Sequence, residues 1–314
     1  MPIPAVAPPV APGTPTSLPP GTRTSRLTGA IDDTGPGGSG LVIPLNAVDD
    51  AYVDWRMQGL DGWDSADLQE LAEAKFGEDG AFDAQNFYGA RTVTITGLLT
   101  APTYEAREAA EYQLRQAVPP RRLIQLRIDE TTPKYVMGRR SGRLLITPLD
   151  DVHSKWSAVI LAPDPRKYGV VAAAADLAVA LPPAGLAPPW TPPITLPTRV
   201  GANDTVTVTN TGSYETQPLV RLVGPGRGFE IENRATGRTL LYDLELGPTD
   251  FLLIDCHAGV ALLNGVAPRS PAPGSAVTSR WVIVPGDNTI QLRGVPTDPA
   301  LVATASIQFN PAWD

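Results

Sequence analysis

The chain has 314 residues, of which 34 are proline, 29 are glycine and only 18% are charged. So many turn residues argue against a helical protein and favour short strands joined by turns. The net charge of −8 argues against binding nucleic acid through clustered basic residues, and the single cysteine, Cys256, excludes an intrachain disulfide or a zinc site made of cysteine pairs.

Residues 1–24 contain eight prolines before Gly21 and are expected to form an extended, polyproline-like arm. Two interpretations of this proline-rich N-terminal arm stay open: disorder in isolation, or ordering against a neighbouring subunit. The arm lacks the basic start and continuous apolar segment of a signal peptide. We therefore expect synthesis in a cytoplasm, without secretion through the chain's own sequence. No apolar run is long enough for membrane insertion.

Residues 25–169 are predicted to form the first domain, a β-sandwich with one flanking α-helix. Residues 40–65 have the pattern of two strands, with turns near 49–50 and 61–62. Residues 65–76, "SADLQELAEAKF", predict a further, weaker helix, because Leu68, Leu71, Ala72 and Phe76 would share one face. In the next strand, Gly97 is expected at a bulge or a crossing point.

The strongest helical pattern of the chain follows that strand and predicts a helix over residues 103–118. Thr103 is a suitable N-cap, and Pro119 and Pro120 end the pattern. Ala106, Ala110, Leu114 and Ala117 would form the apolar face with Ala109 beside them, and Glu111 and Arg115 an exposed pair. A face made mostly of alanine can lie close to a sheet, so the helix is expected to cover an open side of the sandwich.

Strand patterns continue to about Tyr168, where the first domain should end. Residues 170–200 are rich in alanine and proline and are expected to be a semi-rigid linker. Residues 201–314 have no helical period, and strand patterns recur there every eight to twelve residues or so, separated by turn signals such as Asn264–Gly265. They predict a second, antiparallel sandwich of jelly-roll type.

We find no convincing catalytic, cofactor-binding or metal-binding residues. Asp255, Cys256 and His257 are adjacent, but neighbouring side chains of a strand point to opposite faces, so Cys256 is expected to be buried. "GPGRG" at 224–228 is expected to be a turn, because no helix follows to hold a phosphate. His153 and His257 belong to different predicted domains. The pairs 32–33, 49–50 and 150–151, all Asp–Asp, are expected to accept hydrogen bonds from turn backbone.

The chain has six tryptophans, a residue type whose exposed ring can stack on sugar rings. Trp156 and Trp281 lie inside apolar strand patterns and are expected in the core, and Trp190 is expected to be a packing anchor in the linker. No tryptophan marks a sugar site by itself. The remaining three are Trp55, Trp63 and Trp313.

Segments in a characteristic order resemble the distal tail (Dit) proteins, also called minor tail proteins, of siphophages, the bacteriophages with long non-contractile tails. The resemblance covers roughly residues 40–314, whereas the proline-rich N-terminal arm and residues 65–76 depart from the family's pattern. The segments are "GLDGWD" (59–64), "DGAFDAQNFYGARTVTITGLLTAPT" (79–103), "WSAVILAPDPRKYG" (156–169), "VTNTGSYETQPLVRLVGP" (208–225), "IENRATGRTLLYDLELGPTDFLLIDC" (231–256), "LLNG" (262–265), "VPGDNTIQL" (284–292) and "IQFNPAWD" (307–314).

The resemblance implies a structural virion protein of the tail tip, or baseplate, and no enzyme. The first domain would be tail-tube-like and build a homo-hexameric ring around a lumen for DNA, and the second would be a galectin-like sandwich that projects outward. The implied partners are other copies of the chain, the major tail tube protein, the tape measure protein, the tail-associated hub protein and receptor-binding proteins. The low charged fraction fits such subunit contacts, although a neutral, loop-rich surface would also explain it.

Two other functions are alternative hypotheses. A carbohydrate-binding module that contacts host cell-wall glycans through the C-terminal sandwich is the main alternative, but the sugar-binding signature of galectins is not found. A wall hydrolase would need paired carboxylates or a metal in a cleft, and the sequence offers no such set.

Overall fold

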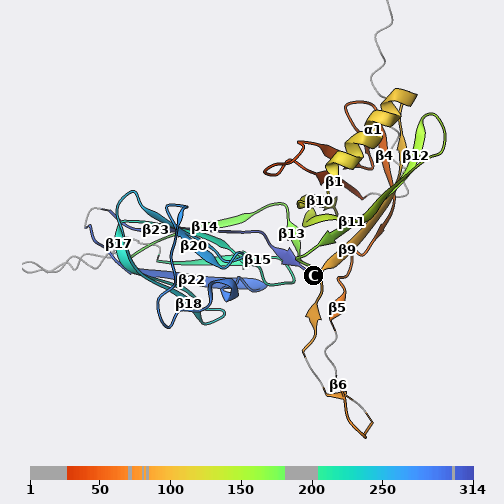
Figure 1. The fold of residues 1–314 in the computed structure, drawn as a ribbon. Coiled ribbons are helices and arrows are strands. Elements are labelled where there is room, and N and C mark those ends of the chain that lie inside the picture. The colour runs from red at the N-terminus through yellow and green to blue at the C-terminus, as the bar shows by residue number, and fades with distance from the viewer. Residues whose placement is uncertain (1–26, 70–72, 80, 83–84, 181–203, 299–300) are drawn as a thin grey trace, which may run out of the picture.

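The structure is a computed structural model that describes residues 27–69, 73–79, 81–82, 85–180, 204–298 and 301–314. It is mainly β, with two sandwiches and, in this described part, one α-helix (Figure 1), which confirms the predicted fold class. Most of the proposed linker and the whole proline-rich N-terminal arm lie outside the described residues. No helix of the described part is long and apolar enough to cross a bilayer.

The first sandwich is one long antiparallel sheet that folds over on itself. Its strands follow the order β2-β1-β10-β11-β12-β9-β4-β3, and β13 and β24 join it beside β11. Their bounds are β1 (Thr28–Asp32), β2 (Val42–Leu45), β3 (Ala47–Val48), β4 (Asp54–Asp61), β9 (Arg91–Thr100), β10 (Ile124–Asp129), β11 (Lys134–Pro148), β12 (His153–Ala162), β13 (Lys167–Gly169) and β24 (Ala312–Trp313).

Two corners turn this sheet into facing layers. The long strand β11 pairs with β10 up to Gly138 and with β12 from Arg139 onward, so it passes from one layer to the other. At the other corner, Asn46 has a left-handed backbone with φ of 60° and separates β2 from β3. Its amide N–H donates to the Trp55 carbonyl at 2.7 Å, and its Oδ1 accepts from the Met57 amide at 2.8 Å. The two ends of the sheet thereby meet in one chain segment, which protects edges that would otherwise be open.

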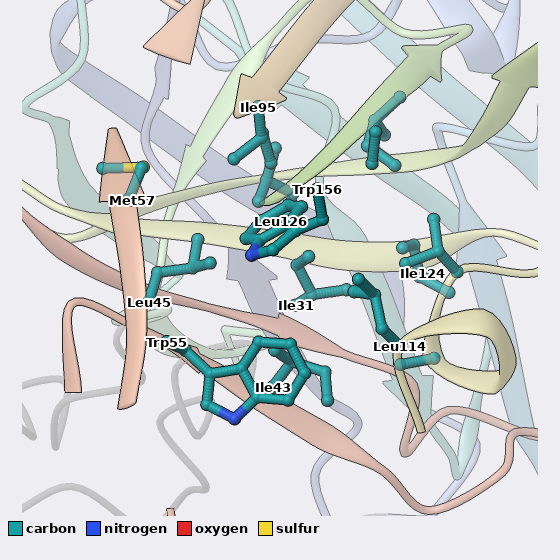
Figure 2. Close-up of a cluster of buried hydrophobic side chains, with 14 of the residues drawn as sticks. Ile31, Ile43, Leu45, Trp55, Met57, Ile95, Leu114, Ile124, Leu126 and Trp156 are labelled. Atoms are coloured by element: carbon teal, nitrogen blue, oxygen red, sulfur yellow. The ribbon is translucent and has the colours of Figure 1, made fainter. Parts of the chain in front are cut away.

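The core between these layers is built around two tryptophans (Figure 2). Trp55 of β4 and Trp156 of β12 are almost fully buried and meet edge to face, with ring centroids 6.5 Å apart. The sequence suggested a bulge or a crossing point at Gly97 of β9, but Gly97 is not itself the bulged residue. The bulge lies opposite, in β4 between Met57 and Gly59, and Gly97 instead gives room to the Trp156 indole.

The predicted helix is present as α1 (Tyr104–Ala117), and Thr103 caps it by accepting a hydrogen bond from the Ala106 amide at 3.2 Å. Its buried face includes Ala110, Leu114 and Ala117 and packs against the first core. Two details of the prediction are wrong: Ala109 is exposed and Glu111 is buried. Glu111 is buried by a second contact, with β12, where it accepts a hydrogen bond from Ser154 at 2.7 Å. It also accepts one from Arg107 of the same helix at 2.5 Å.

The described residues of the segment 65–76 do not form the predicted helix, and a narrow β-ribbon projects from the first sandwich there (Figure 1). The ribbon comprises the described residues between 64 and 90, with β5 (Leu68–Gln69) paired to β8 (Phe87–Tyr88) and β6 (Glu73–Ala74) paired to β7 (Ala81–Phe82). A helix this short needs an apolar surface to pack on. Here Leu68 and Phe76 are exposed, and pairing with a distant segment satisfies the backbone instead.

The second sandwich packs a six-stranded sheet, of order β14-β23-β16-β19-β20-β21, on a four-stranded sheet, of order β15-β22-β17-β18. A short 3-10 helix, Thr278–Arg280, precedes β22. The strand β14 lies inside the segment expected to be a linker. The bounds are β14 (Ala173–Ala178), β15 (Thr205–Asn210), β16 (Leu219–Val223), β17 (Gly226–Asn233), β18 (Arg238–Leu246), β19 (Phe251–Asp255), β20 (Val260–Leu263), β21 (Ala267–Pro268), β22 (Gly286–Val295) and β23 (Thr304–Phe309).

Candidate assembly surfaces

The last strand of the chain ties the two sandwiches together. After β23 the chain returns to the first sandwich, where β24 pairs with β13. The Gly169 amide donates to the Pro311 carbonyl at 2.8 Å, and the Tyr214 amide of the second sandwich donates to the Ala312 carbonyl at 2.9 Å. Residues from both sandwiches thus bond the same short segment, which fixes how the two meet.

A groove of about 880 Å³ lies beside this junction. The first sandwich contributes Tyr135 and Tyr168, whose ring centroids are 5.9 Å apart with planes tilted by 33°. The second sandwich contributes Gln217 and His257. Tyr135 belongs to the outer face of β11, because the side chain of its neighbour Val136 is in the core. The groove therefore combines aromatic surface from one domain with polar groups from the other.

Charged groups hold the groove in shape. The Tyr168 hydroxyl donates to Asp164 at 2.6 Å, and Arg166 donates to the Gln217 side-chain oxygen at 2.8 Å. Burial, and then the negative charge of Asp164, raises the pKa of Tyr168, so this hydroxyl stays protonated and keeps its donor role. The His257 ring lies 3.1 Å from the same Gln217 oxygen. These contacts link residues from both domains and orient the wall of the groove.

Arg91 anchors the base of the ribbon from inside the protein. Its side chain is fully buried and donates to the carbonyls of Trp63 at 2.6 Å and Pro165 at 2.7 Å. The Nη2 atom has no hydrogen-bond partner among the described residues, and Arg91 lines a smaller cavity of about 220 Å³ together with Asp314. Burial lowers the pKa of this guanidinium, although the nearby charge of Asp314 opposes the shift. One side chain thus joins the ribbon to the loop before β13.

The ribbon itself exposes large apolar side chains. Phe76 is fully exposed at its tip, Phe82 is 61% exposed, and Leu68 and Phe87 are each more than half exposed. A two-stranded ribbon without a core is marginally stable in water. Large apolar side chains exposed on one projecting ribbon make it a candidate interaction surface.

The candidate nucleophile is placed as the sequence predicted. Cys256 is buried in the second core, and burial, together with the charge of Asp255, raises the pKa of its thiol to about 12. A thiol with so high a pKa is not a nucleophile at neutral pH. Its neighbours Asp255 and His257 instead line the groove, a position that the sequence did not reveal.

The other sequence candidates take part in turns and strands. Asp49 accepts from the amides of Ala51 and Val53, and Asp150 accepts from the amides of Val152 and His153. In "GPGRG" only Gly224 and Pro225 form the bend, and the rest begins β17.

Asp33 does more than the turn role expected of it. It accepts from the Ser39 amide at 2.8 Å but also forms an ion pair with the partly exposed side chain of Arg122. Asp32, which precedes Asp33 in the sequence, accepts a hydrogen bond from the Thr34 amide at 2.8 Å, as expected of a turn residue.

The tryptophans are mostly unavailable to a ligand. Trp55, Trp63, Trp156 and Trp281 are buried, and Lys134 stacks over the ring of Trp313 at 5.1 Å. Trp190 lies outside the described residues. Within the described ranges, no group of three or more histidine, cysteine, aspartate or glutamate side chains could hold a metal ion.

Comparison with known proteins agrees with the resemblance seen in the sequence. Residues 211–313 match the family described as "Siphovirus-type tail component, C-terminal domain". Among solved structures, the fold is similar to that of the SPP1 Dit protein (gp 19.1), described as a paradigm of the hub adsorption apparatus in phages that infect Gram-positive bacteria. The TM-score is 0.55 at 18% identity, over 82% of this chain and 93% of the other.

A chain of the phage P2 baseplate in its activated conformation with Ca matches with a TM-score of 0.46 and 10% identity, over 90% of this chain and 97% of the other. No curated protein matches the chain. The family match of residues 211–313 and the fold shared with the SPP1 Dit protein confirm the family resemblance and the fold class.

Proposed function

We propose that this chain, whose residues 211–313 belong to the siphovirus-type tail component family, is a structural protein of a phage tail tip. The family match carries the proposal, and the fold shared with the SPP1 Dit protein extends it to the first sandwich. In this role the chain is a distal tail protein that forms a homo-hexameric ring. The ring joins the tail tube and the tape measure end to the tail hub and the receptor-binding proteins, leaves a lumen for DNA and has no enzymatic activity.

The domain organisation of the proposal follows the sequence. The proline-rich N-terminal arm (1–24) precedes the ring-forming sandwich (25–169), and the alanine- and proline-rich segment 170–200 leads to the galectin-like sandwich (201–314). The two separate hydrophobic cores support this division. Two strands refine this division. The strand β14, which lies within 170–200, pairs with β23 of the second sandwich, and β24, at the end of the described chain, pairs with β13 of the first sandwich.

The ribbon is the surface that we assign to contact between copies. Its exposed aromatic side chains need a partner that covers them. In a closed ring, every subunit has a neighbouring copy of the same chain that can cover its ribbon. The net charge of −8 suits a lumen through which DNA passes without being retained.

Mass measurement in solution tests the proposal. Light scattering of the purified chain at micromolar concentration should give about six times the chain mass of 33.2 kDa, with rings in electron micrographs. The double variant Phe76→Ser, Phe82→Ser should shift the mass toward a single chain. Val266→Ser, at an 82% exposed position of the second sandwich, is the matched control and should keep the ring.

A stable single chain that also fails to assemble on purified tail tubes would overturn the structural role. A ring that survives in the double variant would instead move the subunit contact away from the ribbon and leave the role intact.

A further inference from the structure

We propose that the groove between the two sandwiches is a binding site for the proline-rich N-terminal arm of the same chain, seated in the polyproline II conformation. The inference does not depend on ring formation.

The groove has the chemistry that polyproline segments require. Such segments are recognised by aromatic side chains that form ridges against the proline rings, with polar donors beside them for the unpaired backbone carbonyls. Tyr135 and Tyr168 supply paired rings, and Leu123 and Met137 extend the apolar floor. None of the described residues forms a hydrogen bond with the Tyr135 hydroxyl, so this donor can face an occupant.

The groove also suits a neutral occupant. Its acidic residue Asp164 lies 4.0 Å from Arg166, Asp255 accepts a hydrogen bond from the Ala258 amide, and Arg166 donates to Gln217. A charged peptide would have to compete with these contacts. Residues 2–20 carry no charged side chain and are rich in proline, so they can enter without disturbing them.

The described chain starts close to the groove. In the sheet, Ala30 pairs with Arg127, which pairs with Tyr135, which in turn pairs with Tyr168. Strands lie about 4.8 Å apart and rise about 3.4 Å per residue, which places Tyr135 roughly 12 Å from Thr28. The Thr28 side chain donates to Asp129, on the same outer face of the sheet as Tyr135.

The arm is long enough to make this connection within one chain. Pro20 lies seven positions before Leu27, and seven steps of about 3.1 Å span roughly 22 Å, which exceeds the distance to be covered. Gly21 allows the chain to reverse direction before it reaches the groove. The pair Pro19–Pro20 is then the first proline segment that can lie against the tyrosine rings, and a neighbouring copy is not needed.

Photo-crosslinking in the full-length chain tests the site. A p-benzoylphenylalanine probe in place of Met137, which is 39% exposed in the groove, should crosslink to peptides from residues 1–24 of its own chain. The same probe in place of Tyr52, 68% exposed and outside the groove, is the matched control and should not. Mixing heavy and light isotope-labelled copies should give only crosslinks within one chain.

Two variants link the crosslink to the proposed contacts. Tyr135→Ser in the Met137 probe background should lower the crosslink yield by about tenfold, because it removes one of two stacking rings. Pro19→Asp with Pro20→Asp should do the same and leaves every described residue unchanged. An unchanged melting temperature shows that each variant is folded.

Three results would overturn the inference. They are a Met137 crosslink to residues 1–24 no stronger than that from Tyr52, crosslinks between heavy and light copies, and a yield that neither variant reduces.

Discussion

At the scale of single residues, the indole of Trp156 requires a glycine at position 97. A Cβ built on Gly97 would lie 2.5 Å from Trp156, far inside van der Waals contact. Trp156 is fully buried and cannot move aside without disturbing the first core. We expect Gly97→Ala to lower the free energy of unfolding by about 1–3 kcal/mol, as overpacked cores do.

Urea unfolding followed by tryptophan fluorescence measures this effect. Gly35→Ala is the control, since its Cβ would meet nothing within 4 Å, and it should be nearly neutral. Combining Gly97→Ala with Trp156→Phe should cost less than the sum of the single changes, because the smaller ring leaves room. Additive costs would show that the indole is not the cause.

Asp33 carries a second prediction at this scale, one that depends on pH. Burial alone would raise the pKa of this carboxyl, but hydrogen bonds from Arg122 and Ser39 outweigh burial and lower it. A lowered pKa stabilises the fold above the unfolded value of about 4, and the gain is lost as the pH falls through the folded value. We expect Asp33→Asn to cost roughly 1–2 kcal/mol at pH 7, since Arg122 is partly exposed and solvent screens the pair.

Urea titrations of both proteins between pH 2 and pH 7 check the sign. The difference in unfolding free energy should be constant near neutrality and shrink only below about pH 4. Asp243→Asn, at an exposed position of β18, should have little effect at pH 7. A difference that grows toward low pH would contradict the assignment.

At the scale of elements, α1 depends on local signals. Thr103 satisfies the Ala106 amide at the first turn, so Thr103→Ala should cost about 1 kcal/mol of stability. Thr103→Ser keeps the hydroxyl and should restore most of the loss. Thermal unfolding of the three proteins gives the comparison, and equal melting temperatures for the alanine and serine variants would exclude the cap as the cause.

The sequence reveals the elements that depend on local signals and misses those that depend on distant partners. The helix is predicted to within a residue at each end, because Thr103 and the pair Pro119–Pro120 act on their immediate neighbours. The ribbon is not predicted, because Leu68 pairs with Tyr88 and Glu73 with Phe82, partners that no local pattern identifies. The sequence does have the apolar spacing of a helix, but Leu68 and Phe76 are exposed and have no core to pack on.

The groove lies beyond sequence reasoning for a related reason. Asp164, Arg166 and Tyr168 belong to the segment "WSAVILAPDPRKYG", which carries part of the family resemblance, yet nothing in that segment marks a cavity. Their partners Gln217 and His257 come from the second sandwich, far from them in the sequence. Polar residues that act together across two domains leave no spacing signal in the chain.

At the scale of the whole molecule, β24 is the physical link between the two sandwiches. Its backbone bonds β13 of the first sandwich on one side and Tyr214 of the second on the other. Gly212 makes the approach possible, because a Cβ there would lie 1.9 Å from the Ala312 carbonyl oxygen. The segment belongs to neither core alone and therefore transmits stability between them.

Removing residues 311–314 should accordingly uncouple the sandwiches without unfolding either. About three or four backbone hydrogen bonds are lost, each worth about 1 kcal/mol, so the coupling free energy should fall by roughly 3–4 kcal/mol. Calorimetry should then resolve two unfolding transitions, with the first at a lower temperature than in the intact chain. Gly212→Ala should shift the transitions in the same direction while leaving the chain at full length, and a truncated protein that melts in one transition at the original temperature would show that the groove walls, not β24, hold the domains together.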